Sequence, residues 1–302
     1  MSPTPTKVAV DHLSLGVRRG ERFGLLGVNG AGKSSTLKVL CGDHPPTSGA
    51  VHICGHSVAT NLSKVQRVLG YCPQFDPLLE LMTGIETVEM YARLKGVSET
   101  DAPAAAAAVL ASVGLSRFAP RPCGEYSGGN KRKLSLAVAL VGGPQVLLLD
   151  EPSSGMDPLA RRHMWDTIER AAGGLTMVLT THAMDECEAL CERIGMMSAG
   201  KLRCLGSAQH LKGRFGEGYV LDVKVSDEER LTAVIAAIEA AVPPGTCEVI
   251  EAHVGRLKMR LRSPAALAPA FAAVEGCRAA GHLENYAVTQ SSLEDVFVKV
   301  CR

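Results

Sequence analysis

A glycine-rich stretch between a predicted strand and a predicted helix constrains the fold of this chain more than any other feature. Residues 27–34 read Gly-Val-Asn-Gly-Ala-Gly-Lys-Ser and fit the phosphate-binding loop pattern in full. Strands are predicted over residues 8–17 and 21–26, and a helix over residues 33–41, which is the context that the pattern requires. Glycines let backbone N–H groups converge on phosphate oxygens, and the helix adds the positive end of its dipole. The sequence therefore predicts an α/β domain that binds a nucleotide.

Individual residues of this loop have predicted roles. Lys33 is expected to reach the β- and γ-phosphates, and Ser34 is expected to ligate Mg²⁺. The remaining phosphate contacts are expected from the loop and the first helical turn, at Asn29, Gly30, Ala31, Gly32 and Ser35. A chance glycine-rich turn is the alternative, and both the spacing and the context argue against it.

Two carboxylates follow an apolar strand predicted over residues 146–149. A wholly apolar strand is typical of a parallel sheet that is covered on both faces. Ligands of open α/β sheets bind at the carboxyl ends of the strands, where Asp150 and Glu151 lie. Asp150 is predicted to hold Mg²⁺ through water, and Glu151 to polarise the attacking water. Many strands end in an acid, so this pattern gains its weight from the phosphate loop upstream.

A third motif, Ser127-Gly128-Gly129-Asn130, precedes a helix predicted over residues 134–141. A serine followed by glycines at a helix start can bind an anion. Taken alone, a plain helix cap would be the simpler interpretation. Upstream of this motif, the pattern predicts a helical segment over residues 84–115 and a short strand over residues 50–53.

With Gln74 upstream and His182 downstream, these motifs closely resemble the ATP-binding cassette (ABC) family over about residues 7–215. The family implies an α/β P-loop NTPase of the ABC ATPase type, formed by residues 1–215, with a helical signature insert over about residues 75–140. Finer details are similar to the A subfamily, and within it to the second, C-terminal cassette of full-length transporters. The segments that carry this closer resemblance are residues 24–35, 126–134, 151–157 and 204–215.

The resemblance implies further roles and partners. Gln74 would contact Mg²⁺ and sense the γ-phosphate, and His182 would contact the γ-phosphate and orient Glu151. Residues 127–130 would cap the ATP of a second cassette, and Asp157 would couple the two sites. The cofactors would be ATP and Mg²⁺. The partners would be a second cassette, in a homodimer or a full transporter, and a transmembrane domain at the cytoplasmic face of a membrane.

Departures from the family pattern are few. Tyr126 and Asn130 replace the commoner Leu and Gln, as is usual in this subfamily's second cassette. The family stacks adenine on an aromatic side chain upstream of the loop, but residues 1–22 contain no Tyr, Phe or Trp. Adenine binding is therefore the part of the site that the sequence does not assign.

A second domain is predicted after the glycine-rich residues 213–218. Residues 219–302 have the order β-α-β-β-α-β, which predicts a small α+β ferredoxin-like domain. The resemblance implies that it is a regulatory domain. No second phosphate loop is present, so one nucleotide site is expected.

Composition narrows the classes of function. The formal net charge of +1 gives no support for a nucleic-acid partner. The longest apolar runs are far shorter than the ~20 residues of a membrane helix, so another segment or chain would supply the spans. The favoured hypothesis is the ATP-hydrolysing part of a membrane transporter for lipids. The alternatives are a soluble cassette protein acting on nucleic acid or the ribosome, and a non-hydrolysing regulatory cassette.

Residues 75–83, directly after Gln74, are rich in large apolar side chains without a regular period. One interpretation is a buried loop under the helical insert. The other is an exposed groove that receives a short helix of the membrane domain.

Overall fold

The structure is a computed structural model that describes residues 8–216 and 218–301. The chain divides into two compact units after Leu205, and each is described here by itself. The boundary predicted after residue 215 lies one helix later than the observed one. Helix α8 (Ala208–Phe215) belongs to the second unit, where it packs against α11 (Leu293–Cys301). Residues 1–7, which belong to the predicted first domain, lie outside the described residues.

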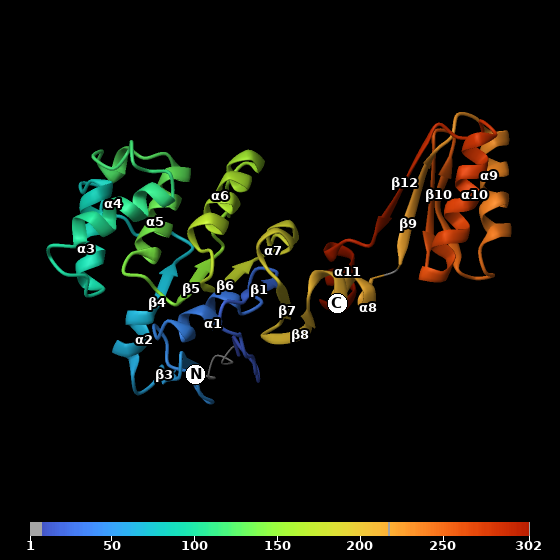
Figure 1. The fold of residues 1–302 in the computed structure, drawn as a ribbon. Coiled ribbons are helices and arrows are strands. Elements are labelled where there is room, and N and C mark those ends of the chain that lie inside the picture. The colour runs from blue at the N-terminus through green and yellow to red at the C-terminus, as the bar shows by residue number, and fades with distance from the viewer. Residues whose placement is uncertain (1–7, 217, 302) are drawn as a thin grey trace, which may run out of the picture. The chain divides into compact units, whose positions relative to one another are not determined.

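A six-stranded sheet forms the centre of the first unit, in the order β4-β5-β6-β1-β7-β8 (Figure 1). Neighbouring strands from β4 to β7 are parallel, so their carboxyl ends meet at one edge. The strands are β1 (Arg22–Gly27), β4 (Leu69–Cys72), β5 (Val146–Asp150), β6 (Thr176–Thr181), β7 (Arg193–Ser198) and β8 (Lys201–Gly206).

Both faces of this sheet are covered. Leu147 and Leu149 of β5 belong to one apolar cluster, whereas Val146 and Leu148 belong to another on the opposite face. Alternate side chains of a strand point to opposite faces, so β5 must be apolar along its length. The helices of the first unit are α1 (Lys33–Leu40), α2 (Leu62–Val68), α3 (Gly84–Leu94), α4 (Ala102–Ser112), α5 (Gly128–Leu140), α6 (Pro158–Ala171) and α7 (Met184–Leu190).

Helices α3, α4 and α5 pack together as the predicted helical insert (Figure 1). Thr83 begins α3 with a capping box, in which its side chain and that of Glu86 each accept from the other's backbone N–H. The single helical segment predicted over residues 84–115 is two helices, because Lys95 and Gly96 end α3 and Pro103 begins α4.

Two local predictions are wrong. Residues 8–17 do not form a strand. They are held by isolated bonds, such as the one from Asp11 N to Gly200 O, and His12 has a φ of 51°, which breaks an extended chain. Of residues 50–53, only His52–Ile53 pair, as the short strand β2 opposite β3 (His56–Ser57). Helix α2 was not predicted, because a short helix with one buried residue, Val65, has little apolar periodicity.

The second unit contains a four-stranded antiparallel sheet in the order β10-β11-β9-β12. On β11 the side chains of Leu257, Met259 and Leu261 are fully buried, while the residues between them are polar. This alternation is typical of a sheet with one face on helices, here α9 (Glu228–Ala241) and α10 (Leu267–Ala279) (Figure 1). The strands are β9 (Tyr219–Lys224), β10 (Cys247–His253), β11 (Arg256–Leu261) and β12 (Asn285–Gln290). The order β-α-β-β-α-β is that of a ferredoxin-like unit.

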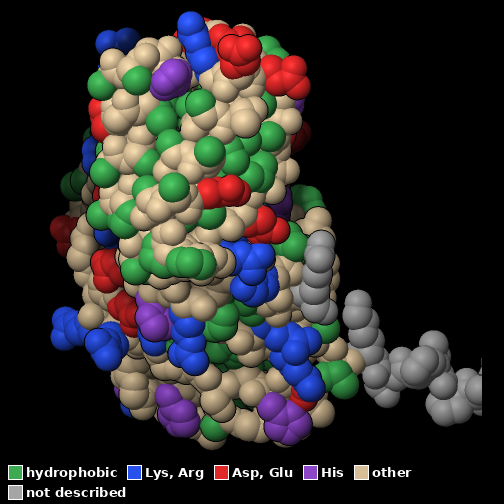
Figure 2. Space-filling view, turned by 90° about the vertical axis from the view of Figure 1, so that its right-hand side faces the viewer, with side chains coloured by type: hydrophobic (Ala, Val, Ile, Leu, Met, Phe, Trp, Pro, Cys, Tyr) green, Lys and Arg blue, Asp and Glu red, His purple; other side chains and the backbone are tan. Residues whose placement is uncertain are grey.

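On the face drawn in Figure 2, apolar side chains lie singly or in small groups among charged ones. Scattered apolar surface of this kind is ordinary and marks no binding site by itself. Within the described residues, no helix combines the length and the apolar character that crossing a bilayer requires.

Candidate functional site

The phosphate loop connects β1 to α1 at the edge of the sheet where the parallel strands end. Gly30 and Gly32 have φ values of 80° and 105°, in the left-handed region that favours glycine. A side chain at Gly32 would also place its Cβ 2.4 Å from Ala9 O. This backbone therefore depends on glycine at position 32. Asn29 is exposed on the loop, and Ala31 is buried beneath it.

Lys33 starts α1 and turns its side chain back into the loop. Its Nζ donates to Gly27 O at 2.7 Å and to Val28 O at 3.2 Å. The same atom lies 3.3 Å from Glu151 Oε1, and both side chains are almost fully buried. The ammonium group is thus placed between the loop backbone and the predicted catalytic carboxylate. Ser35 follows in the first turn of the same helix.

Hydroxyl groups gather around Asp150 at the end of β5. Ser34 Oγ donates to Asp150 Oδ1 at 3.2 Å, and Thr180 Oγ1 donates to the same oxygen at 2.5 Å. Mg²⁺ prefers oxygen ligands and is commonly held by one or two carboxylates together with substrate phosphates. A hydroxyl and a carboxylate beside a phosphate loop fit that requirement. No cluster of three or more His, Cys, Asp or Glu side chains forms a metal cage within the described part of the chain.

Glu151 is the point on which three other predicted residues converge. Its carboxylate lies 3.3 Å from Lys33 Nζ and 3.3 Å from His182 Nδ1, and it accepts from Gln74 Nε2 at 3.3 Å. Glu151 itself has a φ of 47°, a left-handed conformation that is uncommon for residues other than glycine. Gln74, Lys33, Glu151 and His182 come from four separate segments, so the fold alone brings them together.

Ser127 and Asp157 each cap a helix. The Ser127 side chain accepts from Asn130 N at 3.4 Å at the start of α5, and Asp157 accepts from Leu159 N and Ala160 N at 3.0 Å at the start of α6. Apart from the neighbouring residues and the backbone of α5 itself, no heavy atom of the described residues lies within 4 Å of a Cβ built at Gly128 or Gly129. The amino-terminal end of α5 is therefore open for an approaching group.

Two buried charged residues near the site were not predicted. Glu186 on α7 accepts from Trp165 Nε1 at 3.1 Å and is hydrogen-bonded to Ser153 and Thr181. Burial raises the pKa of Glu186, while these three hydrogen bonds act in the opposite direction. Arg132 on α5 is 5% exposed. A sequence signal did exist for both, since each charge falls among the buried positions of its helix.

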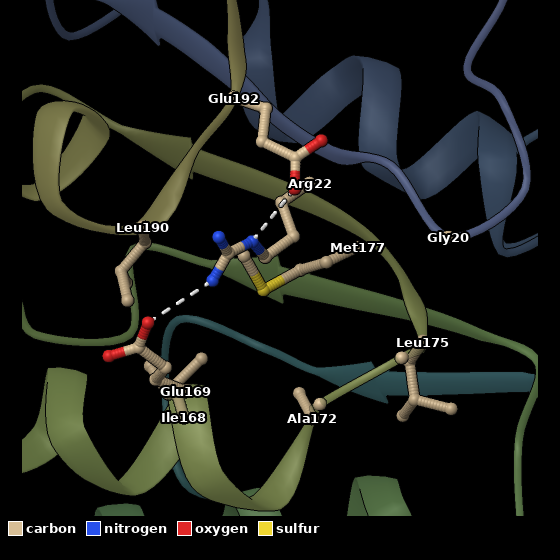
Figure 3. A pocket seen from close by; sticks show the side chains of 11 residues that line it. Gly20, Arg22, Ile168, Glu169, Ala172, Leu175, Met177, Leu190 and Glu192 are labelled. Carbon is tan, nitrogen blue, oxygen red and sulfur yellow. Dashed lines mark hydrogen bonds and ion pairs between the residues drawn. The ribbon is translucent and has the colours of Figure 1, made fainter.

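A separate cavity of about 250 Å³ opens at the opposite edge of the sheet. Figure 3 shows Arg22 between Glu169 and Glu192 above an apolar wall, with N–O distances of 3.4 and 3.3 Å. Arg22 is the first residue of β1, whereas the phosphate loop follows the last. This cavity therefore does not belong to the site.

Comparisons with known proteins identify the family of the chain. Residues 10–154 match the family described as ABC transporter. The chain is 48% identical to the phospholipid-transporting ATPase ABCA7 of Homo sapiens, over 96% of the chain and 14% of that protein. It is 45% identical to the ATP-binding cassette sub-family A member 2 of Homo sapiens, over 98% of the chain and 12% of that protein. The chain thus spans a small part of the length of these relatives.

Solved structures share the fold. The structure of an ATP-binding subunit of an ABC transporter has a TM-score of 0.63 and 28% identity, covering 71% of this chain and 90% of that one. A dimeric ATP-binding cassette in a post-hydrolysis state, bound to ADP and Pi, has a TM-score of 0.60 and 26% identity, covering 66% of this chain and 90% of that one. The chain belongs to the ABC transporter family as an ABC ATPase domain homologous to the A subfamily.

Proposed function

We propose that this chain binds MgATP at the phosphate loop and hydrolyses it to power the transport of lipids across a membrane. The observation that carries the proposal is the convergence of Lys33, Gln74 and His182 on the Glu151 carboxylate, next to Asp150 and the loop. The names of the relatives point to phospholipids as the cargo.

The geometry supports a division of labour among these residues. The loop N–H groups and Lys33 hold the β- and γ-phosphates, and the phosphates compete with Glu151 for the Lys33 ammonium group. Ser34 and Asp150 would hold Mg²⁺, which would supply positive charge beside the phosphates. Glu151, released from Lys33, orients and polarises the attacking water. His182 and Gln74 keep the carboxylate directed at the γ-phosphate.

A second cassette completes the site in this proposal. The open amino-terminal end of α5, at residues 127–129, carries the positive end of the helix dipole and suits an anion. It would cap the γ-phosphate of a partner's ATP, with Asp157 coupling the two sites. The dimeric cassette bound to ADP and Pi, one of the similar structures, supports such an arrangement.

Complementation tests this model. Lys33→Ala and Ser127→Arg chains should each be inactive, and a mixture should recover activity because one composite site keeps an intact loop and an intact α5 terminus. Lys33→Ala mixed with Lys33→Ala is the control. No recovery in the mixture, together with wild-type activity independent of chain concentration, would contradict the dimer.

The proposed contact with a membrane partner lies in the segment after Gln74. Phe75, Leu79 and Leu81 are 81%, 55% and 96% exposed, so the buried-loop interpretation does not account for them. We infer that residues 75–83 receive a helix of a transmembrane domain at the cytoplasmic face. Leu79→Asp in a full transporter should keep basal ATP hydrolysis and lose its stimulation by lipid. Unfolding of the isolated chain by Leu79→Asp would show that Leu79 is needed for the core instead.

The proposal has two further parts. We propose that this chain is the second cassette of a full transporter, and that its second unit is regulatory. Its sheet and helices have their own apolar core, and we propose that it regulates the cassette without binding nucleotide. A chain ending after Gly206, where β8 ends, should still bind ATP. A folded truncation that binds no ATP would contradict this separation.

A further inference from the structure

Arg132 is a buried arginine whose position the motifs of the cassette do not explain. It lies on α5, five residues after Ser127, and its side chain is 6% exposed. A buried guanidinium needs acceptors for its N–H groups, since an unpaired buried charge is strongly unfavourable. Its acceptors identify what this residue does.

One side of the guanidinium holds the loop that carries Glu151. Nη2 donates to Asp150 O at 2.8 Å and to Glu151 O at 3.2 Å, and Nε donates to Pro152 O at 2.8 Å. These are three successive carbonyl groups. They flank the left-handed backbone of Glu151, a conformation that persists only where its surroundings enforce it.

The other side holds the segment that carries Gln74. Nη1 donates to Pro73 O, to Gln74 O at 3.3 Å and to Asp76 Oδ1 at 3.0 Å. A single planar group therefore fixes two segments whose side chains, Gln74 and Glu151, contact each other. A lysine at this position would keep the charge but lose the planar fork that reaches both segments at once.

We propose that Arg132 is a positioning residue for hydrolysis, which holds the Glu151 loop and the Gln74 segment of its own chain in register. This inference rests on the proposed function, and it assigns α5 two tasks. Its amino-terminal end serves the ATP of the partner, whereas Arg132 serves the ATP of its own chain. The effect of Arg132 should therefore depend on which chain of a dimer carries the change.

Mixed dimers with a single working site test this dependence. A chain with Glu151→Gln is paired with a chain that keeps Glu151, and the two are co-purified by different tags. Arg132→Lys on the chain that keeps Glu151 should lower kcat by about 10- to 100-fold, because small misplacements of catalytic groups have effects of this size. Arg132→Lys on the Glu151→Gln chain should change kcat by less than about threefold. ATP affinity should stay within about twofold in both, because Lys33 and the loop are intact.

Arg22→Lys is the matched control. Arg22 also pairs with two acidic groups, at the opposite edge of the same sheet (Figure 3), and its replacement should leave kcat unchanged in either chain. Equal losses for Arg132→Lys in the two positions would show that Arg132 only supports α5, and would overturn the proposal. An unchanged kcat with Arg132→Lys beside Glu151 would do the same.

Amide hydrogen exchange of the single chain separates this proposal from the proposed function. Arg132→Lys should speed exchange in residues 73–76 and 150–153 together, and Arg22→Lys should not. A wild-type chain without ATP hydrolysis would refute the proposed function, whereas unchanged exchange in these two segments would overturn the role of Arg132 whatever the activity.

Discussion

The edge of the first unit where β1, β5 and β6 end buries its charged side chains, whereas the sheet of the second unit keeps its charges in water. Among the described residues, the buried charged side chains are Lys33, Arg132, Asp150, Glu151 and Glu186, each at most 6% exposed. In the second unit the buried polar residue is Ser291. The ion pairs of the second unit, such as Arg256–Asp222 with an N–O distance of 2.6 Å, are half-exposed.

The difference separates charges kept for function from charges kept for solubility. Burying a charge is unfavourable unless it is paired and hydrogen-bonded, and even then a buried pair seldom adds stability. Surface pairs contribute little in either direction. The second unit is stabilised by its aliphatic core, so its charges are replaceable. On the proposed function, the buried charges of the first unit serve chemistry on a phosphorylated ligand.

Replacing Glu151 by Gln should give the largest effect at the buried edge. We expect ATP turnover to fall by about 10²- to 10⁴-fold, as for the removal of other general bases, while ATP still binds. Single-turnover hydrolysis and nucleotide affinity measure the two separately. Glu169→Gln, the same change at the opposite edge, is the control and should stay active. Wild-type turnover in a Glu151→Gln dimer would show that Glu151 takes no part in hydrolysis.

Asp150→Asn should lower the affinity of the nucleotide site for Mg²⁺. Asp150 is expected to hold the ion through water, and the loss of such outer partners commonly lowers metal affinity by about 10- to 100-fold. A magnesium titration of ATP binding at fixed ATP measures the change. Asp166→Asn, at an exposed position of α6, should leave the titration unchanged. An unaltered magnesium midpoint in Asp150→Asn would assign the ion to other ligands.

Much of this edge could be predicted from the sequence, because its motifs are local. The loop over residues 27–34 carries its spacing within eight residues, and β5 carries its apolar run next to Asp150. The separation of α3 from α4 and the short α2 escaped prediction, because their signals are weak. The strand predicted over residues 8–17 does not form: their apolar residues alternate as in a strand, but no strand of the described residues pairs with them.

The roles of Arg132 and Glu186 could not be predicted from the sequence for a different reason. Their partners lie far away in sequence: Arg132 contacts Pro73 and Pro152, and Trp165 donates to Glu186. Many of these partners are backbone carbonyls, which any residue provides, so no residue type marks them. The sequence shows a charge on a buried helix face, and only the fold shows what it binds.

The stability of the chain should depend on pH through the buried Glu186. Burial raises the pKa of Glu186, so the folded chain favours its protonated form more than the unfolded chain does. The free energy of unfolding should therefore fall as the pH rises from the usual glutamate range through this raised pKa. Glu186→Gln removes that dependence, so its stability relative to wild type should improve with rising pH. Urea unfolding between pH 4.5 and 8 tests the sign, with Glu188→Gln on the exposed face of α7 as the control. The opposite slope would mean that the ionised carboxylate is the preferred buried form.

Arg256→Gln in the second unit should give the smallest effect, and one of opposite sign with pH. The hydrogen bond from Arg256 lowers the pKa of Asp222, so the pair stabilises the folded chain at neutral pH and loses this contribution as the pH falls through the lowered pKa. Because the pair is half-exposed, salt should screen what little it contributes. We therefore expect slightly faster amide exchange in β9 and β11 at low salt, little difference at high salt, and ATP turnover within about twofold of wild type. Lys258→Gln, on the same strand, provides a comparison for a change of charge alone. A tenfold loss of turnover in Arg256→Gln would contradict this expectation, because a surface charge of the second unit would then act on the nucleotide site.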